Sequence, residues 1–202
     1  MTAKEVTECR ASLGAVQWVA VQTQPLACAR CNLLLTELTT DPKMSVAQEI
    51  QEIIRELRKS ATVLKFFKLP GVSSWFDLVV VGLGDQAHLN RPKCGSTGGM
   101  LIFLCGPAIC RGAPNPMILV HWKSWKLKRK SIGTNDAEVQ ALVETEDSLF
   151  RTRLLWAEMN GAGAHDTSRN LLEASLDEVQ NVPGLLGTDS KRSEERRVGK
   201  EC

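Results

Sequence analysis

The sequence predicts an α/β protein in which a helical segment precedes a mixed sheet with elements in the order β-β-β-α-β. Three observations support this prediction. Apolar residues recur at helical spacing before residue 60, short β-branched runs follow a break near residue 70, and a second helical pattern begins near residue 135. The chain has 202 residues, 43% of them hydrophobic, so it can bury a core.

The helical segment comes first. Residues 1–40 have a mixed helical pattern, which Asp41 and Pro42 interrupt. Ser45 and Gln48 have the spacing of a capping box, and a helix is predicted over 45–59. The apolar face of this helix is expected to be buried. It carries Val46, Ile50, Ile53, Ile54 and Leu57.

The periodicity changes beyond Pro70–Gly71, which marks an internal boundary. Leu78–Leu83 is a short apolar run typical of a central buried strand. Gly95–Gly99 is interpreted as a turn that leads into a second strand, Met100–Cys105. A third strand is predicted over Met117–Trp125. Strands joined by turns in this way indicate an antiparallel meander.

A long helix is predicted from about Asn135 to Asn160, where a Gly-Ala-Gly sequence stops it. Residues 161–183 are expected to be irregular or weakly helical. Leu185–Thr188 is interpreted as a short fourth strand that ends at Asp189. This strand completes the β-β-β-α-β order.

Charge and cysteine content restrict the class of protein. The formal net charge is +2, so any nucleic-acid contact must come from a local basic patch. The seven Cys are irregularly spaced and no secretory signal precedes them, which predicts reduced thiols in an intracellular protein. Cys28 and Cys31 have the spacing of half a zinc site, but ordinary core or surface thiols are favoured. The longest uncharged stretch, Cys94–Cys110, is too short to span a bilayer, so no membrane contact is expected.

Three acidic residues occupy positions where they could converge. Asp85 follows the first strand, Asp189 follows the last, and Glu138 lies in the first turn of the long helix on its sheet-facing side. Carboxylates in close proximity share protons or bind a cation, and a hard ion such as Mg²⁺ prefers oxygen ligands. The alternative is ordinary local structure, because Asp is common in turns and Glu is favoured early in helices.

Longer segments around these acids resemble the RNase H-type domain of copia-like retrotransposon Pol polyproteins. VVVGLGDQAHLNRPKCGSTGGMLIFL is similar to the first two strands, with the first acid. HWKSWKLKRKSIGTNDAEVQAL is similar to the next strand, a basic link and the start of the helix. LLGTDSK is similar to the strand with the third acid, and SLGAVQWVAVQTQPLA to the segment that joins reverse transcriptase to RNase H. The resemblance covers about residues 11–190.

The sequence departs from the family pattern in several places. Leu26 stands where an acid usually follows Pro25, and Gly133–Asp136 replaces a Ser-rich lead-in to Glu138. The fourth acid, the last helix and the polymerase palm of the family are not matched. The resemblance divides the chain into a helical reverse-transcriptase connection (1–70) and an RNase H-like domain incomplete at its C-terminus (71–191). The tail (192–202), RSEERRVGKEC, resembles a translated sequencing adapter and is expected to be disordered.

The resemblance implies an RNase H-like mixed sheet and metal-dependent hydrolysis of the RNA strand in an RNA/DNA hybrid. Asp85, Glu138 and Asp189 would be the catalytic acids and would hold two Mg²⁺ ions, with Mn²⁺ as an alternative. Two such ions about 4 Å apart activate water and stabilise the leaving oxygen. The implied partners are the hybrid and the rest of the Pol polyprotein, in a cytoplasmic retroelement particle or in the nucleus.

A basic segment, residues 121–130, holds five Lys or Arg residues and two Trp residues. Phosphate contacts are predicted for Lys123, Lys126, Lys128 and Arg129. The two Trp residues would suit base stacking. The alternative is a solvated strand end with Trp122 or Trp125 packed in the core.

Two other hypotheses about function stay open. One is a catalytically inactive, nucleic-acid-binding remnant of a retroelement polyprotein, which predicts salt-sensitive hybrid binding without cleavage. The other is an untranslated relic, which predicts poor solubility and no cooperative unfolding.

Overall fold

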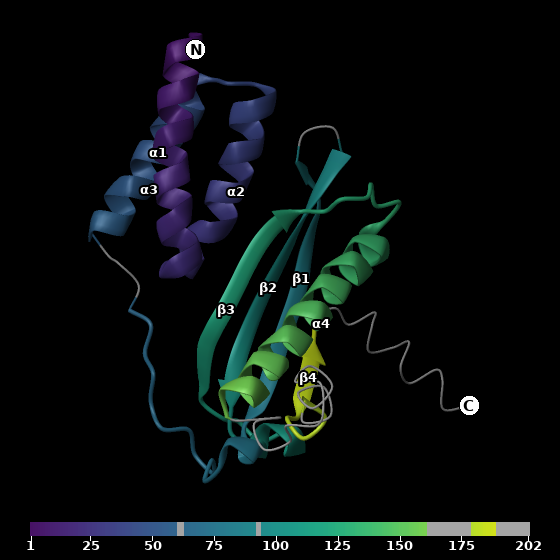
Figure 1. Cartoon of the computed structure of the whole chain (residues 1–202). Coiled ribbons are helices and arrows are strands. Elements are labelled where there is room, and N and C mark those ends of the chain that lie inside the picture. The colour runs from purple at the N-terminus through teal and green to yellow at the C-terminus, as the bar shows by residue number, and fades with distance from the viewer. Residues whose placement is uncertain (60–62, 92–93, 161–178, 189–202) are drawn as a thin grey trace, which may run out of the picture. The chain divides into compact units, whose positions relative to one another are not determined.

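The computed structural model describes residues 1–59, 63–91, 94–160 and 179–188 (Figure 1). Three helices come first and three strands follow. One short 3₁₀ helix precedes the first strand, and another separates the second strand from the third. A long helix and a short strand complete the described elements. In chain order these are α1 (Ala3–Gln22), α2 (Pro25–Thr40), α3 (Met44–Lys59), η1 (Trp75–Asp77), β1 (Val79–Arg91), β2 (Gly95–Cys105), η3 (Pro107–Arg111), β3 (Met117–Lys126), α4 (Thr134–Met159) and β4 (Gly184–Gly187).

The four strands form one sheet in the order β3-β2-β1-β4. β4 runs parallel to β1, with Val80 opposite Gly184 and Leu83 opposite Gly187. β1 and β2 are joined by a connection so short that only an antiparallel pair can use it. The sheet is therefore mixed, and the predicted α/β class with its β-β-β-α-β order is confirmed.

Two strand predictions need correction. β1 does not end at Leu83 but continues to Arg91, so Asp85 lies inside the strand rather than after it. Gly95–Gly99 is not a turn, because β2 already begins at Gly95. Position 98 requires glycine because a side chain of β3 approaches closely: a Cβ on Gly98 would lie 2.6 Å from Cζ2 of Trp125. The other predicted elements match within one or two residues.

Contacts between residues divide the chain into two compact units. The first, called the helical unit, comprises Met1–Lys65, Gln86–Gly99 and Trp122–Glu138. The second, called the sheet unit, comprises Phe66–Asp85, Met100–His121 and Val139–Cys202. β1, β2, β3 and α4 each contribute residues to both units, so this division differs from the boundary near residue 70 that the sequence predicts.

In the helical unit, α1, α2 and α3 pack on one another. α1 begins with a capping box in which Thr2 and Glu5 satisfy each other's backbone N–H groups. The predicted apolar face of α3 is buried at Val46, Ile50 and Ile53. The buried residues of the other two helices are Leu13, Val16, Ala20, Ala27, Cys28, Cys31, Leu34 and Leu38.

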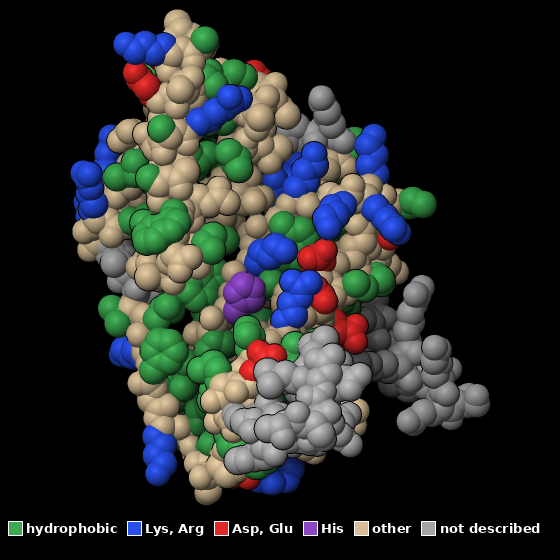
Figure 2. All heavy atoms as spheres, in the orientation of Figure 1, with side chains coloured by type: hydrophobic (Ala, Val, Ile, Leu, Met, Phe, Trp, Pro, Cys, Tyr) green, Lys and Arg blue, Asp and Glu red, His purple; other side chains and the backbone are tan. Residues whose placement is uncertain are grey.

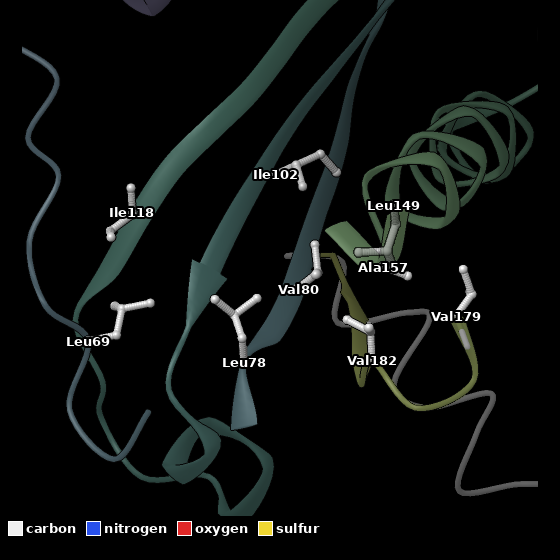
Figure 3. Packing of buried hydrophobic residues seen from close by; sticks show 9 residues of the cluster. All are labelled: Leu69, Leu78, Val80, Ile102, Ile118, Leu149, Ala157, Val179 and Val182. Carbon is white, nitrogen blue, oxygen red and sulfur yellow. The ribbon is translucent and has the colours of Figure 1, made fainter. Parts of the chain in front are cut away.

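In the sheet unit, α4 packs across β1. Side chains from α4 and the strands converge on one interior, with Leu149 and Ala157 projecting from α4 and Val80 and Ile102 from the strands (Figure 3). Gly82 permits this packing, because a Cβ at that position would lie 3.2 Å from Cγ2 of Thr145 on α4. A smaller cluster contains Val79, Val81 and Cys105.

Some predictions fall on residues outside the described part of the chain. These are Asp189, most of the irregular segment 161–183, and the tail 192–202. Within the described part, no helix is long and apolar enough to cross a membrane.

Candidate functional site

Asp85 is exposed, and its position in β1 determines the side of the sheet from which it projects. Gly84, the preceding residue, faces α4: a Cβ on Gly84 would lie 2.6 Å from Oγ1 of Thr145. Side chains of a strand alternate between its two faces. The burial pattern follows this alternation here, because Gly82 and Gly84 are buried whereas Leu83 and Asp85 are exposed. Asp85 therefore leaves β1 on the face opposite α4.

Glu138 is the fifth residue of α4, so it lies just beyond the first turn in which the sequence placed it, and it is only 7% exposed. Leu142 and Thr145 follow at spacings of four and seven residues, so they share a helix face with Glu138. The next residue, Val139, is 57% exposed, in keeping with the opposite orientation. The sheet-facing orientation that the sequence indicated for Glu138 agrees with this burial pattern.

Asp189 follows β4 by two residues and lies outside the described residues. Among the residues that the structure does describe, no three or more His, Cys, Asp or Glu side chains are grouped so that they could hold a metal ion. The predicted metal site includes Asp189, so the three-acid site stays a prediction.

The basic segment lies at the end of β3 and just beyond it. The side chains of Lys123, Lys126, Lys128 and Arg129 are all exposed. Between them, Leu127 is buried and its backbone N–H donates a hydrogen bond to the carbonyl oxygen of Ser96 at 2.9 Å. The backbone that carries these cations is therefore hydrogen-bonded to β2. On the face that Figure 2 shows, Lys and Arg side chains lie in small groups.

Neither tryptophan of the basic segment is an open stacking surface. Trp122 is only 6% exposed, and its Nε1–H donates a hydrogen bond to the carbonyl oxygen of Ala20 in α1 at 2.9 Å. Trp125 is half-buried with its six-membered ring against Gly98, and the Lys123 ammonium lies over it, 5.1 Å from the ring centroid. The packed alternative is confirmed for Trp122.

Arg91 is a structural residue that the sequence pattern did not single out. It is 5% exposed, and its Nε donates to Oγ1 of Thr97 at 2.8 Å. Its other nitrogens reach α2, where they donate to Oγ1 of Thr36 and to Oδ1 of Asn32. Burial lowers the pKa of Arg91. Arg91 lies within the segment VVVGLGDQAHLNRPKCGSTGGMLIFL that resembles the first two strands of the family, but nothing in that segment indicates a contact with α2.

Cys28 and Cys31 lie on the buried side of α2. Burial raises the pKa of both thiols, and that of Cys31 rises to about 11, with proximity to Cys28 as a second cause. A metal ligand or a reactive thiol requires the thiolate form. Both cysteines therefore have the properties of core thiols, which is the interpretation that the sequence favoured.

Comparisons with known proteins add little. No protein-family model matches the chain, and no curated protein matches it. Among solved structures, it is similar to the foamy viral protease-reverse transcriptase in complex with an RNA/DNA hybrid, with a TM-score of 0.25 and 10% sequence identity. The match covers 81% of this chain but only 27% of that protein. A TM-score this low carries no argument, so any function assigned to the chain must depend on its own residues.

Proposed function

We propose that the chain is an RNase H-type domain of a copia-like retroelement polyprotein, which hydrolyses the RNA strand of an RNA/DNA hybrid with divalent metal ions. Asp85 and Asp189 are the proposed metal ligands, and Glu138 is the third acid that the family resemblance implies. Lys123, Lys126, Lys128 and Arg129 are the proposed contacts to the nucleic-acid backbone.

One observation carries the proposal: the register of the parallel pair β1–β4. Leu83 lies opposite Gly187, and Asp85 and Asp189 each follow two residues later. The described pairing ends at Leu83 and Gly187, and the two aspartates lie at equal distances beyond it along the sequence, so the proposal assigns both carboxylates to one metal site. Two adjacent carboxylates repel each other unless they share a proton or a cation. Their oxygen atoms suit a hard ion such as Mg²⁺, with Mn²⁺ as a substitute.

The register concerns only the two aspartates, and Glu138 enters the proposal only through the family resemblance. It is a buried carboxylate on the α4 face that also carries Thr145. Thr145 packs on the side of β1 that Gly84 faces, whereas Asp85 leaves β1 on the opposite side, so the structure does not bring Glu138 and Asp85 together. When bound to Asp85 and Asp189, two Mg²⁺ ions would supply an activated water and stabilise the leaving oxygen. The acids of this chain would hold and orient the ions, and the basic segment would orient the hybrid.

The proposal is tested by incubating the purified chain with a labelled RNA/DNA hybrid in Mg²⁺ or in EDTA. We expect cleavage of the RNA strand in Mg²⁺ only. Asp85→Asn should reduce the rate by on the order of 10³-fold, because it removes a charged oxygen ligand while preserving shape. Glu138→Gln tests whether the acid on α4 contributes as well. Glu146→Gln is the matched control, since Glu146 is an exposed acid on the same helix.

The outcomes separate the hypotheses. Cleavage that survives Asp85→Asn would disprove the site assignment, and cleavage that survives Glu138→Gln would restrict the site to the two aspartates. An equal loss in Glu146→Gln would show that the effect comes from α4 in general rather than from the acid at 138. Hybrid binding that falls with salt, without cleavage at any Mg²⁺ concentration, would replace the proposal with the inactive nucleic-acid-binding remnant.

A further inference from the structure

We propose that Trp125 is a positioning residue that holds the Lys123 ammonium for contact with a nucleic-acid phosphate, so that the basic segment binds the backbone without stacking on bases. The inference rests on the nucleic-acid contact of the proposed function but not on the metal site. Three features of the helical unit support it. They are the contact between Lys123 and Trp125, the packing of the Trp125 ring on Gly98, and the hydrogen bond from Trp122 to α1.

The first feature is the geometry of Lys123 and Trp125. The two residues are separated by one position on β3, so their side chains leave the strand on the same face. The Lys123 nitrogen lies 5.1 Å from the centroid of the Trp125 ring, within the range of a cation–π interaction. A lysine has four rotatable bonds, and an aromatic ring beside its ammonium reduces the number of positions that the charge occupies.

The second feature is the contact between the Trp125 ring and Gly98. Gly98 on β2 has no side chain where Trp125 crosses it, and an added Cβ would lie 2.6 Å from Cζ2 and 2.7 Å from Cε2 of the indole. Leu127, two residues further along, also lies close to Gly98. Because Gly98 has no side chain, the ring can lie directly against the sheet. A base would have to displace this packing, or the lysine ammonium, to stack on the ring.

The third feature is that Trp122 does not offer an alternative stacking surface. Its indole is buried, and its N–H group donates a hydrogen bond to Ala20 in α1. Binding of single-stranded nucleic acid usually depends on aromatic side chains that stack with successive bases. Binding through phosphates alone depends on cations, is insensitive to sequence and weakens with salt. The arrangement of the basic segment favours the second mode.

The experiment measures dissociation constants by fluorescence anisotropy in EDTA, where hydrolysis cannot contribute, over a series of salt concentrations. The probes are an RNA/DNA hybrid and its separate RNA strand. The variants are Lys123→Ala, Trp125→Leu, the double variant and Trp125→Phe. Trp18→Leu is the control because Trp18 is an exposed tryptophan on α1. Circular dichroism checks that each variant is folded.

We expect Lys123→Ala and Trp125→Leu to weaken hybrid binding by a similar factor, on the order of fivefold near about 0.1 M salt. Each should also reduce the dependence of the dissociation constant on salt concentration by the amount expected for about one phosphate contact. The double variant should bind no more weakly than either single variant, because both changes remove the same contact. Trp125→Phe should retain part of the affinity, and Trp18→Leu all of it. The ratio of hybrid to single-strand affinity should be unchanged by Trp125→Leu.

Other results would overturn the inference. If the two losses add in the double variant, or if Trp125→Leu weakens single-strand binding selectively, Trp125 stacks on bases. If neither variant changes hybrid binding, the pair does not touch the backbone, although Mg²⁺-dependent cleavage would still support the proposed function. Conversely, the expected binding pattern without any cleavage would leave this inference in place and disprove the catalytic proposal. The absence of any binding would overturn both.

Discussion

The polar links of the helical unit, in which a buried guanidinium and an indole N–H reach oxygen atoms far along the chain, can be compared with the interior of the sheet unit, where aliphatic side chains pack between α4 and the strands. Arg91 joins the end of β1 to α2, and Trp122 joins β3 to α1. The sheet unit has links of the same kind, because Arg153 donates to the carbonyl oxygens of Val179 and Val182 and the indole N–H of Trp156 donates to that of Trp75. Its interior, however, is formed by aliphatic side chains such as Leu149, Val80 and Ile102. Hydrogen bonds are directional and specify which surfaces meet, while apolar burial supplies most of the free energy.

This contrast predicts two responses to mutation. Removing one partner of a polar link should lower the free energy of unfolding, because the remaining polar groups stay buried without hydrogen-bond partners. An apolar interior should respond to lost volume and tolerate changes that conserve volume. Substitutions at four positions, with their controls, test the contrast, and each is measured as a change in the free energy of unfolding by urea titration with circular dichroism.

The largest effect is expected for Leu149→Ala in the sheet unit. Leu149 is 5% exposed, so its truncation should cost about 3 kcal/mol through lost burial and a residual cavity. Leu149→Met conserves volume and should cost less than about 1.5 kcal/mol. Equal losses for the two variants would show that this interior depends on shape rather than on volume.

Arg91→Ala should destabilise the helical unit by about 2 to 3 kcal/mol, because Asn32, Thr36 and Thr97 lose a charged hydrogen-bond donor. Arg91→Met removes the desolvated charge as well as the bonds but keeps the apolar stem, so its cost should be smaller. Arg58→Ala is the control, since Arg58 is exposed on α3. A loss no greater than that of Arg58→Ala would contradict the role of Arg91 as a link.

Gly84→Ala should cost about 2 kcal/mol by overpacking, because the new Cβ would meet Oγ1 of Thr145 at 2.6 Å. Thr145 cannot easily turn away, since its hydroxyl donates to the carbonyl oxygen of Ala141 at 2.8 Å. Adding Thr145→Ala to Gly84→Ala should recover part of the loss. Gly99→Ala, where a Cβ meets nothing within 4 Å, should be close to neutral. A neutral Gly84→Ala would mean that α4 does not pack tightly on β1.

The smallest effect is expected for Trp122→Phe, at about 1 kcal/mol. Phenylalanine fills much of the same space but cannot donate to the carbonyl oxygen of Ala20, which is then left without the indole N–H. Trp18→Phe, at a site 68% exposed, should have no measurable effect. If both substitutions behaved alike, the indole hydrogen bond would contribute nothing to the attachment of β3 to α1.

Most of the secondary structure followed from local pattern. The apolar stripe of α3 predicted its bounds within one residue, and the β-branched run at Leu78–Leu83 located the first strand. The local pattern failed at Gly95–Gly99 and in the second half of β1. At both places, strand pairing outweighed residue preference, because contacts from a neighbouring strand, such as Trp125 over Gly98, are absent from any local window.

The sequence by itself determined the class of fold, the order of its elements, the amphipathic helices and the identity of the acids and cations proposed for function. These properties depend on side-chain periodicity, which is local. Only the tertiary structure decided which side of β1 carries Asp85, which strand lies beside it, and that Arg91 and Trp122 are buried links rather than exposed groups. Those properties depend on pairing register and on contacts between residues more than fifty positions apart, which no local pattern specifies.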